Sequence, residues 1–157
     1  LAKGFVDPTL ICLIRDPIDR FYSLYNDCRS RESHPLKNKA QNGPEAFLDS
    51  LIEDPVSAVN IHQCSYLCGS NSFADAWDLL ADRRVFIADL TQFNSFYAYL
   101  SASENWKPIV WDKKNVKGSK INDHYPRCGK LSSRLFTLFS EDFRLREAVL
   151  KLKEFRV

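Results

Sequence analysis

A short apolar run followed directly by a helix-start signal constrains the fold of this chain more than any other feature. Residues 9–14 read Thr-Leu-Ile-Cys-Leu-Ile, which has the length and composition of a strand buried on both faces, as in a parallel sheet. Arg15, Asp16 and Pro17 come next. Because Asp is a favoured N-cap residue and Pro suits the first helical position, we expect a strand over 9–14 and a helix that begins at Pro17.

The helix that begins there is expected to be amphipathic. Its large apolar side chains recur at helical spacing, and they are Ile18, Phe21, Tyr22 and Tyr25. The polar side carries Asp16, Asp19, Arg20, Ser23, Asn26 and Asp27. We therefore expect the apolar side to pack against a sheet. Arg15 at the end of the strand and Ser23 two turns into the helix are then able to face one cavity.

The remainder of the chain alternates between a second strand and further helices. A second apolar run predicts a strand over residues 85–90. Helices are predicted over 44–53, over 56–68, from a Ser72 cap to about residue 82, from a Thr91 cap through Leu100, and over 131–154 with a break near Ser140. Residues 30–43 and 105–130 are interpreted as loops, and the second of these is basic. The order of elements is typical of an α/β domain with right-handed crossovers.

Arg15 and Ser23 form the most informative polar pair in the sequence. An arginine that leaves the carboxyl end of a buried strand lies where open α/β sheets bind ligands. Its guanidinium can hold a phosphate in a bidentate manner, and the Ser23 hydroxyl can donate a further hydrogen bond. The N-terminus of the following helix adds positive potential. An alternative stays open for a lone Arg-Asp-Pro, namely that Arg15 pairs with Asp19 while Ser23 faces water.

The whole motif resembles that of a known family. Arg-Asp-Pro-x-x-Arg-x-x-Ser-x-Tyr, from Arg15 to Tyr25, resembles the 3′-phosphate-binding motif of sulfotransferases, and is closer to the carbohydrate (Golgi-type) branch. The resemblance implies that Arg15 and Ser23 bind the 3′-phosphate of the donor 3′-phosphoadenosine-5′-phosphosulfate (PAPS). It also implies transfer of a sulfonate group to an acceptor hydroxyl, expected on a carbohydrate, and a Golgi lumen location if the source is a eukaryote.

The resemblance carries expectations about the fold and the domain. It implies a P-loop-NTPase-like three-layer fold, with a parallel sheet flanked by helices that is incomplete in this chain. Residues 1–157 are expected to form a single sulfotransferase-type domain fragment. Its 3′-phosphate-binding strand and helix lie at 9–30, and its basic nucleotide-closing loop lies at about 105–130.

Weaker similarities extend the candidate site. The loop expected to close over the nucleotide contributes Asn115, Lys117, Ser119 and Lys120. The segment from Asn60 to Gly69 resembles the family's N-x-x-Q stretch, and it nominates Asn60, His62 and Gln63 as contacts for the acceptor. Asp142-Phe143 resembles the family's closing helix.

The sequence also departs from the family pattern. The family's P-K-x-G-x-T/S loop, which holds the 5′-phosphosulfate, has no counterpart, because Lys3-Gly4 is followed by Phe5-Val6-Asp7. We expect that loop and the general base to lie upstream in a longer enzyme, so no catalytic residue is assigned. Two other functions stay open for this protein. One is a non-catalytic nucleotide-binding module, and the other is a P-loop kinase relative with Asp89 as its metal-binding carboxylate.

Composition and charge argue against a nucleic-acid partner, a membrane span and a zinc site. The 157 residues carry 22 basic and 20 acidic side chains, a balance that does not indicate a nucleic-acid binder. No apolar run reaches the ~20 residues of a membrane span. Cys64 and Cys68 have neither a second cysteine pair nor a histidine cluster, so no zinc site is expected. Lysine and arginine can supply the positive charge that sulfonate transfer needs without a metal.

Overall fold

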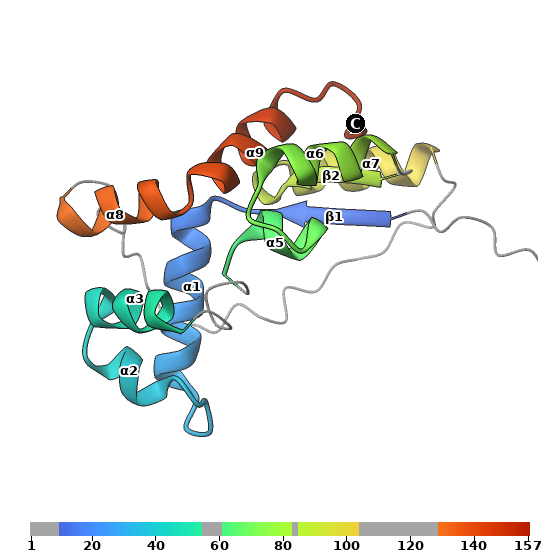
Figure 1. Cartoon of the computed structure of the whole chain (residues 1–157). Coiled ribbons are helices and arrows are strands. Elements are labelled where there is room, and N and C mark those ends of the chain that lie inside the picture. Colours follow the sequence, from blue (N-terminus) through green and yellow to red (C-terminus); the bar gives the residue numbers. More distant parts are fainter. Residues whose placement is uncertain (1–9, 55–60, 83–84, 104–128) are drawn as a thin grey trace, which may run out of the picture.

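The computed structural model describes residues 10–54, 61–82, 85–103 and 129–157. Its elements, labelled in Figure 1, are β1 (Leu10–Ile14), α1 (Pro17–Ser30), α2 (Lys37–Gln41), α3 (Pro44–Glu53), α5 (Gln63–Cys68), α6 (Phe73–Asp82), β2 (Val85–Asp89), the 3-10 helix η1 (Leu90–Gln92), α7 (Phe93–Ser103), α8 (Lys130–Leu138) and α9 (Ser140–Leu150). The two predicted strands, the helix that begins at Pro17 and the break before Ser140 are confirmed.

The two strands pair in parallel, and their carboxyl ends lie side by side. The register pairs Leu10 with Val85 and Ile14 with Asp89. Therefore Arg15, which follows β1, lies at the same edge of the sheet as Asp89. The other edge of β2 meets the end of the chain, where the amide of Ile87 donates to the carbonyl of Phe155 at 2.9 Å.

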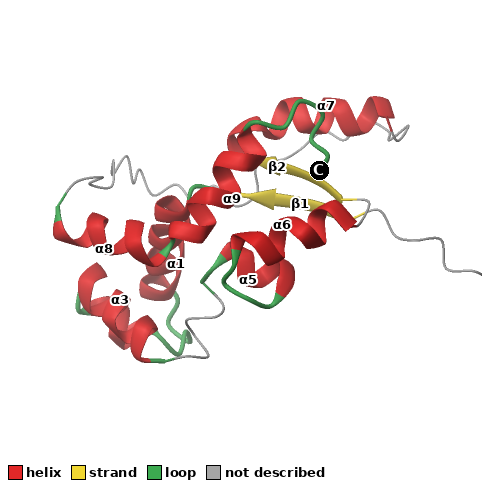
Figure 2. Ribbon diagram, turned by 45° about the horizontal axis from the view of Figure 1, so that its top comes forward, coloured by secondary structure: helices red, strands yellow, loops and turns green. Residues whose placement is uncertain are grey.

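Helices flank both faces of this small sheet, as an α/β chain requires. Figure 2 shows α7 on one side of the strands and α5 and α6 on the other. Side chains from α5, α6 and α9 pack with the inward residues of one face, which are Ile14, Val85 and Ile87. On the opposite face, Phe86 and Ala88 pack with Phe96 and Leu100 of α7.

The prediction that β1 is buried on both faces is wrong. Leu10, Ile11 and Leu13 are each about 40% exposed, whereas every residue of β2 is buried. The difference arises because α7 contacts β2, and because β2 is the only strand that pairs with β1 within the described residues. The other edge of β1 therefore has no strand beside it among the residues that are described.

α1 packs against helices and not against the sheet, which corrects a second expectation. Its buried side chains share a cluster with Phe47 and Leu48 of α3, Leu135 of α8 and Ala40. Ala40 belongs to α2, a short helix inside the segment 30–43 that the sequence led us to interpret as a loop. Figure 1 shows α1 extending from the end of β1 toward α2 and α3. The aromatic side of α1 thus packs against these helices.

Two helix boundaries also differ from the predictions. Thr91 does not cap the helix after β2; Asp89 does so, since its carboxylate accepts from the Thr91 amide at 2.9 Å. The last helix ends at Leu150 and not at residue 154, because the chain turns there and Phe155 packs against Phe96 and Tyr99. The Ser72 cap is confirmed by a 3.2 Å bond from the Asp75 amide.

Candidate functional site

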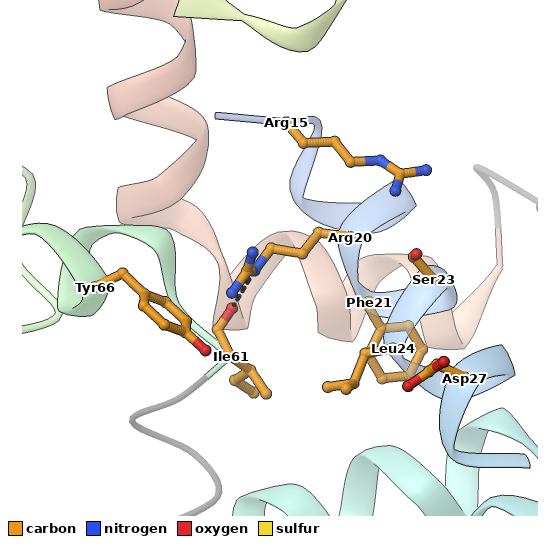
Figure 3. A pocket seen from close by; sticks show the side chains of 8 residues that line it. All are labelled: Arg15, Arg20, Phe21, Ser23, Leu24, Asp27, Ile61 and Tyr66. Atoms are coloured by element: carbon orange, nitrogen blue, oxygen red, sulfur yellow. Dashed lines mark hydrogen bonds between the residues drawn. The ribbon is translucent and has the colours of Figure 1, made fainter. Parts of the chain in front are cut away.

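A cavity of about 340 Å³ opens beside the end of β1 and the first turns of α1. Its lining residues, shown in Figure 3, are Arg15, Arg20, Phe21, Ser23, Leu24, Asp27, Ile61 and Tyr66. The structure therefore brings Arg15 and Ser23 to one cavity, as the helical spacing predicts. In Figure 3 the Arg15 guanidinium and the Ser23 hydroxyl lie on the same side of α1, with the hydroxyl directed toward the guanidinium.

Neither the Arg15 guanidinium nor the Ser23 hydroxyl has a partner in the part of the chain that the structure describes. The Arg15 guanidinium makes no hydrogen bond or ion pair within the described ranges, and so it does not form the Arg15–Asp19 pair of the alternative interpretation. Ser23 is exposed, and its hydroxyl likewise has no partner among the described residues. A free guanidinium beside a free hydroxyl is a donor set that suits a phosphate group.

The N-terminal amides of α1 are not available to a ligand. Asp16 Oδ1 accepts from the amides of Ile18 and Asp19 at 3.0 and 3.1 Å, and Pro17 has no amide hydrogen. The positive potential expected at the start of this helix therefore comes without free amide donors from its first turn. An anion in the cavity would be held by side chains, with only the helix dipole adding to their potential.

Arg20 also lines the cavity, and two contacts hold its side chain in place. Its Nε donates to the Ile61 carbonyl at 3.2 Å, and its guanidinium lies 4.8 Å from the centre of the Tyr66 ring. Tyr66 itself is 65% exposed, so most of this aromatic ring is accessible. The sequence motif gave no role to Tyr66, because its contact with Arg20 joins residues from separate helices.

Gln63 is hydrogen-bonded to the main chain of Arg15. The Arg15 amide donates to Gln63 Oε1 at 2.7 Å, and Gln63 Nε2 donates to the Arg15 carbonyl at 2.8 Å. Gln63 also lines a neighbouring cavity along β1, but only 5% of it is exposed. The acceptor contact predicted for Gln63 thus involves a side chain whose two amide atoms already have partners.

Asp142 anchors the start of α5, which carries Gln63. Its buried carboxylate accepts from the amides of Gln63 and Cys64 at 2.9 and 2.8 Å. Burial raises the pKa of this carboxyl, but the nearby His62 ring and the two amides outweigh burial and lower the pKa below its usual value. His62 is itself buried, with Nδ1 3.7 Å from Asp142 Oδ2, and it packs against Phe139.

Arg146 of α9 joins the carboxyl ends of the two strands. Its Nη1 lies 2.7 Å from Asp16 Oδ2, and its Nε lies 2.6 Å from Asp89 Oδ2. Burial opposes ionisation of Asp89, but hydrogen bonds from Arg146 and Thr91 outweigh it and lower the pKa of the carboxyl. Sequence analysis assigned no role to Arg146, since no local pattern marks a contact with Asp16, 130 residues away in the chain.

The remaining sequence-based candidates lie outside the described residues, and they are Asn60, Asn115, Lys117, Ser119 and Lys120. The acceptor contact of Asn60 and the closing loop therefore stay predictions. Away from the cavity, the His34 ring contacts Cys28 Sγ at 3.6 Å and accepts from the Leu36 amide. Cys12, Cys28, Cys64 and Cys68 are free thiols.

Comparison with protein-family models, with curated proteins and with solved structures found no match to this chain. Among the described helices, none has the length and apolar character needed to cross a membrane.

Proposed function

We propose that Arg15 and Ser23 form a half-site for the 3′-phosphate of an adenine nucleotide, and that the parent protein is a sulfotransferase that uses PAPS. The observation that carries the proposal is the meeting, at one cavity, of a guanidinium and a hydroxyl that have no partner among the described residues. Arg15 follows the carboxyl end of a parallel strand, which is where open α/β sheets bind ligands. On this proposal the sheet is part of a P-loop-NTPase-like fold.

The chemistry that PAPS supplies is a transferable sulfonate group. The acceptor oxygen bonds to sulfur, the bond from sulfur to the nucleotide phosphate breaks, and the acceptor proton passes to a base. Arg15 and Ser23 would bind the nucleotide away from the reacting sulfur and hold it in place, and positioning of this kind supplies much of such catalysis. The acceptor is proposed to be a carbohydrate hydroxyl, on the strength of the sequence resemblance.

One observation weighs against the kinase alternative. A P-loop kinase needs a carboxylate after the second strand that is free to bind a metal. Asp89 occupies that position, but Arg146 and Thr91 hold both of its oxygens. Release of Asp89 would leave the Arg146 guanidinium with one carboxylate in place of two, so this arrangement favours a structural role for Asp89.

The proposal is tested by calorimetric titration of the 157-residue chain with 3′-phosphoadenosine-5′-phosphate (PAP) and with AMP. PAP should bind more tightly than AMP, because only PAP carries the 3′-phosphate. Arg15→Ala should weaken PAP binding by about 10- to 100-fold, the range expected for loss of a charged hydrogen bond. Ser23→Ala should weaken it by about 2- to 10-fold, since the hydroxyl is neutral.

Matched controls come from the last turn of the same helix. Arg29→Ala and Ser30→Ala remove the same chemical groups at exposed positions outside the cavity lining, and they should leave both affinities unchanged. Equal binding of PAP and AMP by the unaltered chain would contradict the proposal. So would an Arg15→Ala variant that keeps the full preference for PAP.

A further inference from the structure

The Gln63 carboxamide continues the hydrogen bonding of β1 by one residue beyond the strand. It accepts from the Arg15 amide at 2.7 Å and donates to the Arg15 carbonyl at 2.8 Å, as the peptide group of a neighbouring strand would. Gln63 is 5% exposed, so water competes little for these two bonds. Both polar groups of the Arg15 main chain are thereby satisfied by one side chain.

The two hydrogen bonds from Gln63 help to fix the main chain from which the Arg15 side chain extends. The guanidinium has no partner among the described residues, so its position depends on the main chain from which it extends. That main chain is fixed by β1 on one side, by Asp16 as the α1 cap on the other, and by Gln63 at Arg15 itself. Rotation of the peptide groups of Arg15 would break both bonds to Gln63.

Gln63 is in turn held by a third element. The buried Asp142 carboxylate of α9 accepts from the Gln63 amide at 2.9 Å, which fixes the first residue of α5. Asp142 therefore positions Gln63, and Gln63 positions Arg15. The three residues come from α9, α5 and the end of β1. A series of hydrogen bonds therefore connects α9 to the Arg15 main chain through α5.

We propose that Gln63 is a positioning residue, which holds the Arg15 main chain so that the guanidinium meets a 3′-phosphate, and that it thereby sets the preference for 3′-phosphorylated nucleotides. This inference rests on the proposed function of the cavity. It goes beyond that function because it assigns the selectivity of Arg15 to a side chain that does not contact the ligand. Gln63 would act on PAP binding only through Arg15.

The test compares the affinities of PAP and AMP in variants of the 157-residue chain. Gln63→Met keeps the length of the side chain but makes neither hydrogen bond, and Gln63→Asn keeps the amide but is one methylene shorter. Gln41→Met is the matched control, because Gln41 is exposed on α2. Far-UV circular dichroism and thermal unfolding establish that each variant is folded before its binding is measured.

The ratio of the AMP to the PAP dissociation constant is the readout. It should fall in Gln63→Met by at most the fall seen in Arg15→Ala, about 10- to 100-fold, because Gln63 acts on the 3′-phosphate only through Arg15. It should fall less in Gln63→Asn and stay unchanged in Gln41→Met. In the Arg15→Ala background, Gln63→Met should have no further effect, because the two substitutions act on the same contact.

The outcomes separate this inference from the proposed function. If Arg15→Ala lowers the ratio while folded Gln63→Met or Gln63→Asn keeps the original ratio, only the positioning role of Gln63 is overturned. Equal weakening of PAP and AMP in the Gln63 variants would also overturn it, because a general structural defect is not selective. If Arg15→Ala leaves the ratio unchanged, the proposed function fails and the role of Gln63 fails with it.

Discussion

The carboxylate of Asp16 lies 2.7 Å from the guanidinium of Arg146, which follows it in the chain by 130 residues. The Asp16 oxygen that faces Arg146 is Oδ2, while Oδ1 accepts from the first amides of α1. One side chain therefore caps α1 and joins the start of α1 to α9. Arg146 extends the connection to Asp89 at the end of β2, so three elements meet beside the candidate site.

Two substitutions of Asp16 should separate its two contacts. Asp16→Asn keeps an oxygen that can cap α1 but loses the charge that pairs with Arg146, whereas Asp16→Ala loses both. Both variants should be less stable than the unaltered chain, and Asp16→Ala should be less stable than Asp16→Asn by about 1 kcal/mol, the usual value of an N-cap. Urea unfolding measures the difference. Equal stability of the two variants would show that the cap contributes nothing.

Removal of the Arg146 guanidinium should lower the free energy of unfolding far more than removal of a surface arginine. Arg146→Met leaves the buried carboxylates of Asp16 and Asp89 without their shared partner, which typically costs about 3–5 kcal/mol. Arg144→Met is the control, because Arg144 pairs with Glu141 at the surface, where such pairs contribute about 0–1 kcal/mol. A loss of stability in Arg146→Met that is no larger than the loss in Arg144→Met would contradict the role of Arg146 as the shared partner of Asp16 and Asp89.

Stability should fall in acid because of Asp89 and Asp142. The folded state holds the pKa of both carboxyls below the usual value, which is about 3.9 in an unfolded chain. Their contribution is therefore fully present above about pH 4 and is lost as the pH falls toward the folded-state pKa. Urea unfolding between pH 6 and pH 3 should show a declining free energy of unfolding below that point.

Asp142→Asn should flatten this acid response. The variant cannot lose a proton at position 142, so its free energy of unfolding should decline less between pH 5 and pH 3 than that of the unaltered chain. At pH 7 it should be less stable by about 1–3 kcal/mol, because the amides of Gln63 and Cys64 lose a charged acceptor. An unchanged pH profile would contradict the lowered pKa of Asp142, because it would mean that this pKa is the same in the folded and unfolded chains.

The buried thiols should resist alkylation. Burial, with the charge of Asp27 adding to it, raises the pKa of the Cys28 thiol to about 11, and burial likewise raises the pKa of Cys64. Since the thiolate is the reactive form, iodoacetamide at pH 8 should modify both only after unfolding in urea. Mass spectrometry of the labelled chain measures the rates. Labelling of Cys28 in the folded chain as fast as that of the half-buried Cys68 would contradict this assignment.

The local sequence carries enough information to predict the strands and the approach of Arg15 to Ser23. The apolar runs at 9–14 and 85–90 have the length and composition of strands, and the Asp16-Pro17 pair marks the start of α1. Ser23 shares the polar side of α1 with Asp27, which also lines the cavity. Each of these features depends on residues about two helical turns apart or on a single continuous run.

The other contacts of the site, and the packing of α1 and β1, depend on residues that are far apart in the sequence. No local pattern encodes them. The pairing of Gln63 with Arg15 spans 48 residues, and that of Asp142 with Gln63 spans 79. The sequence indicated that α1 has an apolar side but not what covers it, and α3 and α8 cover it where a sheet was expected. The exposure of β1 is similarly set by where α7 lies relative to the two strands.

The central claim, that Arg15 meets a 3′-phosphate, is tested most directly by nuclear magnetic resonance of the arginine side chains. The Nε–Hε signal of Arg15, assigned by its disappearance in Arg15→Lys, is followed while PAP or AMP is added to the ¹⁵N-labelled chain. We predict a saturable shift of this signal with PAP, little shift with AMP, and no shift of the Arg29 signal with either. Saturable PAP binding that leaves the Arg15 signal in place would contradict the claim.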